Sequence, residues 1–544
     1  MSRIQNILII ALVFITMNAF AQNADTVIKN NTIEITQSYQ PEIKQNPKPV
    51  LHPILPPADT THPVFTYDVP QQTLLYTYNS TPLRPLALGK DSSVNEYNHY
   101  LKLGGGNLST LLFDYGEDSK GKNIFNTPGD GIVHLRSLSQ KGDIANMQTW
   151  LLDGEISGTV YGKDKLWRPT LSFLRNQFYD YGYDHAIYQY DAGQVIQTYT
   201  GVRAGVDMRN TDEALFNYAP GIFFSSYSGT NNNTTLSEGT LYITVPVSYA
   251  LDTTIQLKAS VNATVTQNKI ASASTTNNIF QFSPGIEFHK DAISAHAYIC
   301  PTAGKDKSYI LPDIAAAYKI PSGPFVISAG WKGALIQNSY QQLSTENPYL
   351  SPLYTIAQTR SNEVFGNVNL GLGPHITLTG RISFWQYDQM PLFVNDFADP
   401  KHFDVVYDSQ LNATSILLAA KYQVGNTFSA DLSITSFSFS NGTLPQTWHV
   451  PTQRIKGSVS YRPVKELYIT AYFNVLGGIN AVDSTGKTVA LNNTLDLGFY
   501  SEYNFINRLS VFVQANNLLN NKNERWLGYA SYGFNIFGGV RLKF

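Results

Sequence analysis

Residues 532–544 decide the fold, and they read Tyr532-Gly533-Phe534-Asn535-Ile536-Phe537-Gly538-Gly539-Val540-Arg541-Leu542-Lys543-Phe544. Val540, Leu542 and Phe544 lie on one face of an extended chain, and Arg541 and Lys543 lie on the other face. This alternation predicts a strand with lipid on one side and a watery lumen on the other. An ordinary strand of a soluble β-sandwich is the alternative, because it alternates in the same way.

A period of two runs through most of residues 98–544. Between Ile255 and Val265 every odd position is apolar and every even position is polar. Repeated alternation of this kind predicts β-strands with two unlike faces. The sequence therefore predicts an all-β fold, a transmembrane antiparallel β-barrel over residues 97–544. The charged side chains on the polar faces are expected to point into the lumen, and they are Arg203, Asp207, Arg209, Lys258, Asp431 and Asp496.

Short turns alternate with long linkers along the same region. Examples of the short turns are Gly162-Lys163-Asp164, Pro463-Val464 and Asn504-Phe505. We expect long linkers at residues 185–198, 228–237, 340–362, 388–411, 440–453, 478–492 and 518–530. Short turns at one end and long loops at the other are typical of outer-membrane barrels, whose long loops face outside. The pattern predicts about 20–22 strands, with about 22 favoured, and an even number is expected for such barrels.

The amino-terminal region predicts export. Residues 1–21 have a charged start, an apolar stretch and a small-x-small cleavage site, so we expect a signal peptide cut between Ala21 and Gln22. This places the chain in the outer membrane of a Gram-negative cell. Residues 22–96 are rich in proline, which neither donates to a sheet ladder nor fits a helix interior. We interpret them as an extended strap, in the periplasm or in the lumen, and not as a folded plug.

Composition excludes several classes of function. Only 14% of the residues are charged and 13% are aromatic, and the net charge of −2 gives no sign of a nucleic-acid partner. The single cysteine, Cys300, excludes an internal disulfide and a thiolate metal cluster. No catalytic, cofactor-binding or metal-binding motif is recognisable, and no cofactor is expected. If the chain were an outer-membrane enzyme, His296 or His375 beside a serine would be the pair to examine.

Three segments carry a family resemblance. Asn516–Tyr529 ends a strand with Asn-Leu-Leu-Asn and continues with Lys-x-Glu-x-Trp-x-Gly-Tyr, followed by the final strand. Together with Tyr100–Thr110 and Arg175–Asp184, it resembles plug-less, TonB-dependent receptor-like outer-membrane proteins of Bacteroidota. The resemblance implies a barrel whose last strand is read by the barrel-assembly machinery, through Val540, Leu542 and Phe544. Only about 75 residues precede the barrel, which is too few for the plug of classical receptors.

Three functions are open at this point. The resemblance favours a non-enzymatic scaffold or accessory subunit of an outer-membrane assembly for protein folding or export. Its partners would be membrane lipid, the barrel-assembly machinery, and other outer-membrane or periplasmic proteins bound through residues 22–96 and the long loops. The alternative is an outer-membrane transporter or channel for solutes. An outer-membrane enzyme is the third hypothesis, and it has the weakest support.

Overall fold

The computed structural model describes residues 99–544, except 125–126, 212–214, 232–233, 322, 353–355 and 484. Of residues 121–124 it describes the backbone but not the side chains. The predicted signal peptide with its cleavage site at Ala21 and Gln22, and the strap at 22–96, lie outside the described residues. They stay predictions.

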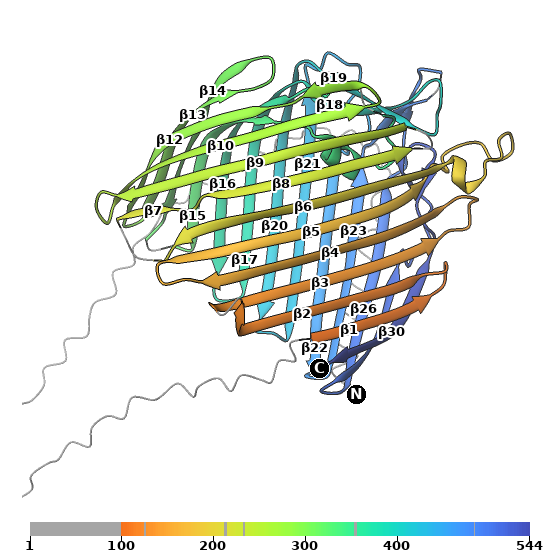
Figure 1. Cartoon of the computed structure of the whole chain (residues 1–544), viewed down its shortest axis with the longest axis horizontal. Helices are drawn as coiled ribbons and strands as arrows, with labels where there is room; N and C mark the ends of the chain where they lie inside the picture. Colours follow the sequence, from red (N-terminus) through yellow and green to blue (C-terminus); the bar gives the residue numbers. More distant parts are fainter. Residues whose placement is uncertain are drawn as a thin grey trace, which may run out of the picture. The chain divides into compact units, whose positions relative to one another are not determined.

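The described chain forms one closed antiparallel wall of 22 strands (Figure 1). Each strand pairs with the next along the chain, and β1 pairs with β30 to close the ring. The first eleven strands of the wall are β1 His99–Gly106, β2 Leu111–Ile124, β3 Thr127–Lys141, β4 Gln148–Tyr161, β5 Lys165–Tyr179, β6 Ile196–Asn210, β8 Gly221–Asn231, β9 Thr234–Ala250, β10 Ile255–Ile270, β12 Ile279–Lys290 and β13 Ile293–Ala303. The others are β14 Ser308–Lys319, β15 Phe325–Ile336, β16 Thr359–Leu372, β17 Ile376–Asp388, β20 Leu411–Val424, β21 Phe428–Ser440, β22 Gln453–Val464, β23 Leu467–Gly477, β26 Thr494–Ile506, β27 Leu509–Asn516 and β30 Asn535–Lys543.

Shorter elements lie outside this ring. β7 (Phe216–Tyr218) and β11 (Ala273–Thr276) pair with β9 and β10. Three hairpins stand in the long loops, and they are β18–β19 (Met390–Asn395 and Phe403–Asp408), β24–β25 (Asn480–Val482 and Thr488–Ala490) and β28–β29 (Glu524–Trp526 and Tyr529–Ala530). The helices are η1 (Ala192–Gln194) and α2 (Tyr340–Glu346). None of the helices in the described ranges is long and apolar enough to cross a membrane.

The two faces of the wall differ as the period of two predicts. Large apolar side chains stand exposed on one face of nearly every strand, as for Ile310, Phe384 and Val459. The residues that alternate with such side chains lie on the opposite face, and many are polar or charged. Lys258 beside the exposed Leu257 and Asp431 beside the exposed Leu432 are examples. An apolar outer face buries favourably in lipid, and a barrel satisfies its backbone hydrogen bonds between strands. The predicted fold class, an all-β closed barrel of 22 strands, is confirmed.

The two ends of the barrel differ in loop length. Turns at 162–164, 291–292 and 507–508 join strands at one end, and connections at 180–195, 337–358 and 517–534 join them at the other. Most of the expected long linkers lie within a few residues of their observed bounds. The linker expected at 228–237 is wrong, because Ser228 to Asn231 and Thr234 to Ser237 continue β8 and β9 as a paired ladder. Serine and threonine there interrupt the apolar pattern, yet the strands extend past it.

Two predicted turns are displaced along the chain by irregular pairing. Pro463-Val464 still belongs to β22, and the turn follows at 465–466, because the register shifts between Tyr461 and Val464. Asn504-Phe505 belongs to β26, where the register shifts between Asn504 and Ile506. A bulge adds a residue to one strand and so moves the turn.

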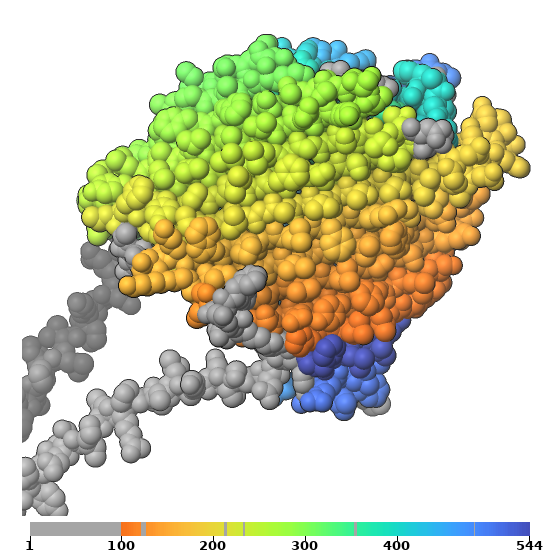
Figure 2. All heavy atoms as spheres, in the orientation of Figure 1, coloured from red at the N-terminus to blue at the C-terminus, as the bar shows by residue number. Residues whose placement is uncertain are grey.

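Glycines make the closing seam possible. A Cβ on Gly539 of β30 would lie 1.8 Å from the carbonyl oxygen of Leu103 of β1. A Cβ on Gly104 of β1 would lie 2.7 Å from the Phe512 ring of β27, which packs over the seam. In Figure 2 the first strands of the wall (orange) adjoin the last one (blue), and this junction depends on residues without a side chain.

We predict that Gly539→Ala prevents closure of the barrel, because the obstacle is backbone and does not move aside as a side chain would. Gly371→Ala is the matched control, since a Cβ at Gly371 on β16 would meet nothing within 4 Å. The measurement is the heat-modifiable migration of the membrane-inserted barrel on a gel. Equal amounts of folded barrel for both variants would contradict the prediction.

Candidate functional site: a loop lid over a charged lumen

Long loops fold over the end of the barrel from which they start and pack on one another. We call these loops the lid, and its described residues are 180–195, 337–352, 356–358, 389–410, 441–452 and 517–534. Their buried core includes Tyr181, Tyr340, Leu343, Tyr349, Leu350, Phe393, Phe403, Trp526 and Tyr529. These loops start from separated sectors of the wall, so their meeting point lies across the mouth of the lumen.

An aromatic contact joins three of these sectors. The Tyr349 and Tyr529 rings stack with centroids 3.6 Å apart, and the Tyr181 ring meets Tyr529 edge-on at 4.9 Å. The Tyr181 hydroxyl donates to the Ala530 carbonyl at 2.9 Å, and the Tyr529 hydroxyl donates to the Lys401 carbonyl. Burying such rings stabilises the closed lid, and deleting one typically costs about 3–5 kcal/mol.

Glycines set the approach of two loops at this contact. Gly182 lies so close to Tyr529 that an added Cβ would be 2.3 Å from the ring. Gly528 adopts φ +87°, a conformation that favours glycine, and it faces the carbonyl of Gly182. The segments 175–184 and 516–529, which carry the family resemblance, therefore meet in the lid.

A buried charged group fastens a second part of the lid. The His402 ring contacts Asp180 through Nε2 and Asp399 through Nδ1, both at 3.0 Å. Burial alone would lower the pKa of His402, but its hydrogen bonds with the two carboxylates and their charges raise that pKa to about 9. The hydrogen bond to His402, followed by that from Lys401, holds the pKa of Asp399 well below its usual range. His402 is therefore charged at neutral pH and joins the loop after β5 to the β18–β19 hairpin.

A second histidine of the lid has the opposite character. His449 is buried against Phe403 and Trp526, and burial, then the charge of Arg525, lowers its pKa to about 3. The Arg525 guanidinium lies over the Trp526 ring at 4.3 Å and donates to the His449 carbonyl. Protonation of His449 would place a second cation beside Arg525, so the neutral ring suits the closed lid.

The helix α2 attaches the lid to the inside of the wall. Its backbone N–H at Tyr340 donates to the Glu238 carboxylate of β9 at 2.7 Å, and Ser339 caps Gln342. The Ser344 hydroxyl lies 2.8 Å from that of Tyr227 on β8. Tyr227 and Glu238 project from the face opposite the exposed apolar side chains, so α2 packs inside the barrel.

Below the lid, several charges on the inner wall are paired between neighbouring strands. The pairs include Arg168–Asp207 at 2.7 Å, Lys258–Glu287 at 2.8 Å, His296–Asp313 at 3.2 Å and Arg541–Glu502 at 3.5 Å. Pairing of this kind weakens the local field around each pair.

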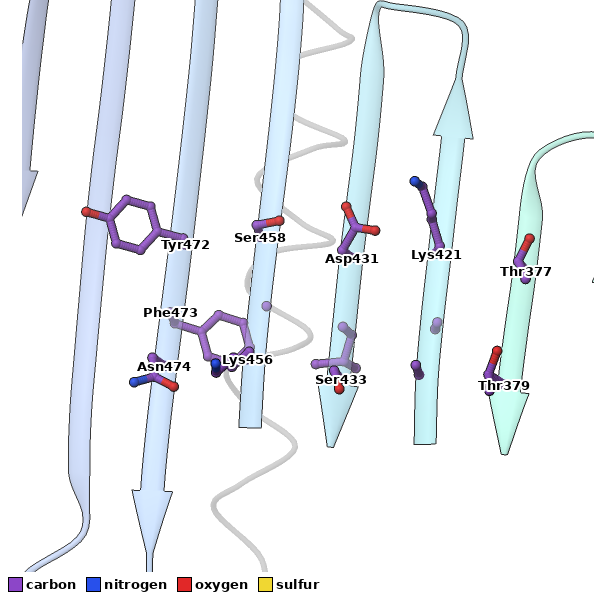
Figure 3. A pocket seen from close by; sticks show the side chains of 14 residues that line it. Thr377, Thr379, Lys421, Asp431, Ser433, Lys456, Ser458, Tyr472, Phe473 and Asn474 are labelled. Atoms are coloured by element: carbon purple, nitrogen blue, oxygen red, sulfur yellow. The ribbon is translucent and has the colours of Figure 1, made fainter. Parts of the chain in front are cut away.

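Two hollows open from the lumen. One of about 680 Å³ lies along β17 to β23, where Lys421, Asp431, Ser458 and Tyr472 project from neighbouring strands (Figure 3). The other, of about 460 Å³, lies between the lid and β23, β26 and β27, and Tyr349, Trp526 and Asp496 line it. Asn474 lines both hollows, and its buried Oδ1 has no hydrogen-bond partner in the part of the chain that the structure describes.

The residues singled out from the sequence occupy different places. Arg203, Asp207 and Arg209 lie on the inner face of β6, opposite the face of the exposed Val202. The Arg203 guanidinium lies over the Phe223 and Tyr242 rings. Lys258 pairs with Glu287, Asp431 lines the hollow of Figure 3, and Asp496 accepts the Asn517 N–H at 3.1 Å under the lid. The structure does not bring these six together.

Other predicted residues lie on the wall. Val540, Leu542 and Phe544 are exposed at the closing seam, and their role in assembly stays a prediction. His296 faces Asp313, and His375 lies 2.8 Å from the Gln423 carbonyl. Sequence reasoning missed His402, His449 and α2, which follow no strand pattern. Asp180 and Tyr529 could have been found, because both lie in segments with the family resemblance.

Comparison with known proteins supports the fold. No protein-family model and no curated protein matches the sequence. Among solved structures, the chain is similar to the FrpB iron transporter from Neisseria meningitidis (F3-3 variant), with a TM-score of 0.65 and 10% identity over 82% of this chain and 81% of that one. It is also similar to the ferric yersiniabactin uptake receptor FyuA from Yersinia pestis, with a TM-score of 0.62 and 13% identity over 82% and 80% of the two chains.

A third similar structure is the ferripyoverdine receptor of the outer membrane of Pseudomonas aeruginosa, with a TM-score of 0.60 and 9% identity over 82% of this chain and 72% of that one. At these identities the likeness concerns the fold. The fold is that of a TonB-dependent receptor-like outer-membrane barrel with 22 strands, as the family resemblance predicted. The expected origin in Bacteroidota stays a prediction.

We predict that the closed lid loses stability as the pH rises. The protonated His402 ring contributes fully below its ordinary pKa of about 6.5, and the contribution is lost as the pH rises through about 9. The loss is on the order of 3 kcal/mol at most. The measurement is the thermal midpoint of the near-ultraviolet circular dichroism of the aromatic cluster, at about pH 7 and about pH 10. His402→Gln is the control, and an unchanged pH dependence in that variant would contradict the assignment.

Proposed function

We propose that the chain is a non-enzymatic outer-membrane transport barrel in which the lid gates the passage of solutes. The observation that carries this proposal is the stacking of Tyr349 on Tyr529, supported by Tyr181, across the mouth of a lumen with charged walls. An apolar contact between loops can open without breaking the wall, because no loop strand takes part in the ring. A partly filled wide lumen and a closed mouth suit gated passage.

The lumen indicates the class of solute. Paired charges of both signs on the inner wall favour small polar solutes without strong selection for anions or cations. The two hollows share Asn474, so polar space by Lys421 on the wall adjoins the hollow that Trp526 lines under the lid. The names of the similar structures, an iron transporter and a ferric yersiniabactin uptake receptor, agree with transport as a class. Export by the predicted signal peptide would bring the chain to this membrane.

Opening the lid tests the proposal. Tyr529→Ala removes the central ring of the lid, which costs the closed lid about 3–5 kcal/mol. That energy raises the ratio of open to closed lids by roughly a hundredfold or more. We predict a higher single-channel conductance or open probability in planar bilayers. Tyr188→Ala is the matched control, because that tyrosine lies in the same loops but is 51% exposed. Equal conductance of the two variants and the unaltered protein would contradict gating by the lid.

A scaffold or accessory role is the second candidate, and one observation favours it. Ile187, Tyr188 and Phe397 stand on the lid loops with exposed fractions of 70%, 51% and 58%. Exposed apolar side chains outside the lipid zone are a cost in water and suit a protein partner. In this role the partners would bind the loops, and the predicted strap at 22–96 would bind others.

One triple variant separates the scaffold role from gated transport. Replacing Ile187, Tyr188 and Phe397 together by serine is predicted to remove any stoichiometric outer-membrane partner from a mild-detergent purification. Conductance should stay unchanged, because these side chains take no part in the buried contact of the lid. Partners that stay bound to the triple variant would rule out this surface as the docking site.

A further inference from the structure

One seam of the wall is interrupted. Pairing between β12 and β13 runs to Gln281↔Thr302, stops, and resumes at Gly285↔Tyr298. The interrupted stretch contains Pro284 on β12 and Pro301 on β13. Proline has no N–H to donate, so each one removes a ladder hydrogen bond. A barrel wall in lipid has no water to replace that bond, which makes this seam the easier one to open.

The next seam on the same hairpin is also incomplete. Pairing between β14 and β15 begins at Asp313↔Lys332 and does not include Ser308 to Pro312. β13 and β14 remain fully paired with each other, from Ile293↔Tyr318 to Ala303↔Ser308. The outer part of the β13–β14 hairpin, which lies towards the upper left of Figure 1, is therefore held weakly on both sides.

Two hollows lie back to back at this interrupted seam. One of about 500 Å³ is lined by Lys258, Ser283, Tyr298 and Lys332 of the inner face. The other, of about 470 Å³, is lined by Val261, Phe280, Phe282, Pro301 and Ile310 of the outer face. Asn262 and Gln281 line both hollows, so one layer of side chains separates them. The ladder between β4 and β5 is also interrupted, opposite Pro169, and the pair of opposed hollows is what distinguishes the β12–β13 seam.

The two hollows differ in chemistry. The outer one faces lipid with apolar side chains, and Ile310 is 76% exposed there. The inner one contains Lys258, paired with Glu287, and Asp313, paired with His296. Lys332 faces Asp313 in the β14–β15 register but forms no ion pair among the described residues, because Asp313 contacts His296 instead, so the Lys332 ammonium is open to an anion in the inner hollow. An apolar groove outside and a spare ammonium inside match a molecule with an acyl chain and an anionic head.

We propose that the β12–β13 seam is a lateral portal that admits an anionic, acyl-chain membrane lipid from the surrounding leaflet, with its chain in the outer groove and its head group at Lys332. This route runs through the wall and not through the mouth, so it does not rest on gating by the lid. The occupant is a lipid because the outer groove opens on the lipid-facing side of the barrel.

The native cysteine allows a direct test of the seam. In the β12–β13 register Cys300 faces Ser283 across the interruption, and in the β13–β14 register it faces Leu311 across a continuous ladder. Residues facing each other on antiparallel strands are close enough for a disulfide. Ser283→Cys therefore staples the portal on oxidation, and Leu311→Cys is the matched control, which staples the same cysteine to the other neighbour.

The readout is cross-linking of a phosphatidylglycerol with a photoreactive head group, in vesicles that contain the full-length protein. We expect adducts on Tyr298 or Lys332 of the inner face, their loss in oxidised Ser283→Cys, their return on reduction, and their persistence in oxidised Leu311→Cys. Conductance should be unchanged in all of them, which separates failure of the portal from failure of gated transport. The same vesicles with a phosphatidylcholine probe should give fewer inner adducts, because the spare cation selects an anionic head.

A second variant tests the portal without the disulfide, in case the Ser283→Cys protein assembles poorly. Replacing Pro284 and Pro301 together by valine restores two backbone donors and is expected to abolish the inner adducts, and Pro169→Val on β5 is the control that keeps them. Adducts confined to the outer face, or inner adducts that persist in the stapled and the valine variants, would overturn the proposal and leave only ordinary lipid around the barrel.

Discussion

The pairing of β1 with β30 closes the wall, and the rest of the structure depends on that closure. A ring of 22 strands has no free edge, but it encloses a lumen too wide for wall side chains alone to fill. The chain covers the mouth with its long loops, which meet where Tyr349 stacks on Tyr529. The glycines at the seam and at the lid serve the same need, since both places require backbone to approach closely.

The barrel has two kinds of contact with different consequences. Wall strands are held by backbone ladders, and several of their inner charges are paired, as in Arg168–Asp207. The lid is held by side chains, by aromatic packing and by the charged His402 between Asp180 and Asp399. Side-chain contacts can be exchanged without disrupting the ring, which makes the lid the part suited to movement. The seam between β12 and β13 is a place where the ladder of the wall itself is interrupted, with a hollow on each side of it.

The wall was predictable from the sequence, and the lid was not. Alternation such as Val540-Arg541-Leu542-Lys543 specifies a strand and both of its faces, because side chains point to opposite sides in turn. Contacts such as His402 with Asp180 join loops that are remote in sequence, and no local period encodes them. The linker predicted at 228–237 was wrong, because β8 and β9 continue through residues that are too polar to show the apolar alternation of a strand. Pro284 and Pro301 are visible in the sequence, yet only the register places them on one interrupted seam.

The central claim is that the lid opens as one unit above a stable wall. Hydrogen exchange of the full-length protein in bilayer discs, followed by mass spectrometry, tests it directly. Opening of the lid as one unit predicts that segments 180–195, 337–358 and 517–534 exchange together in one correlated step, while wall segments such as β16 and β17 stay protected. Independent exchange of each loop, or protection of the loops equal to that of the wall, would contradict the account.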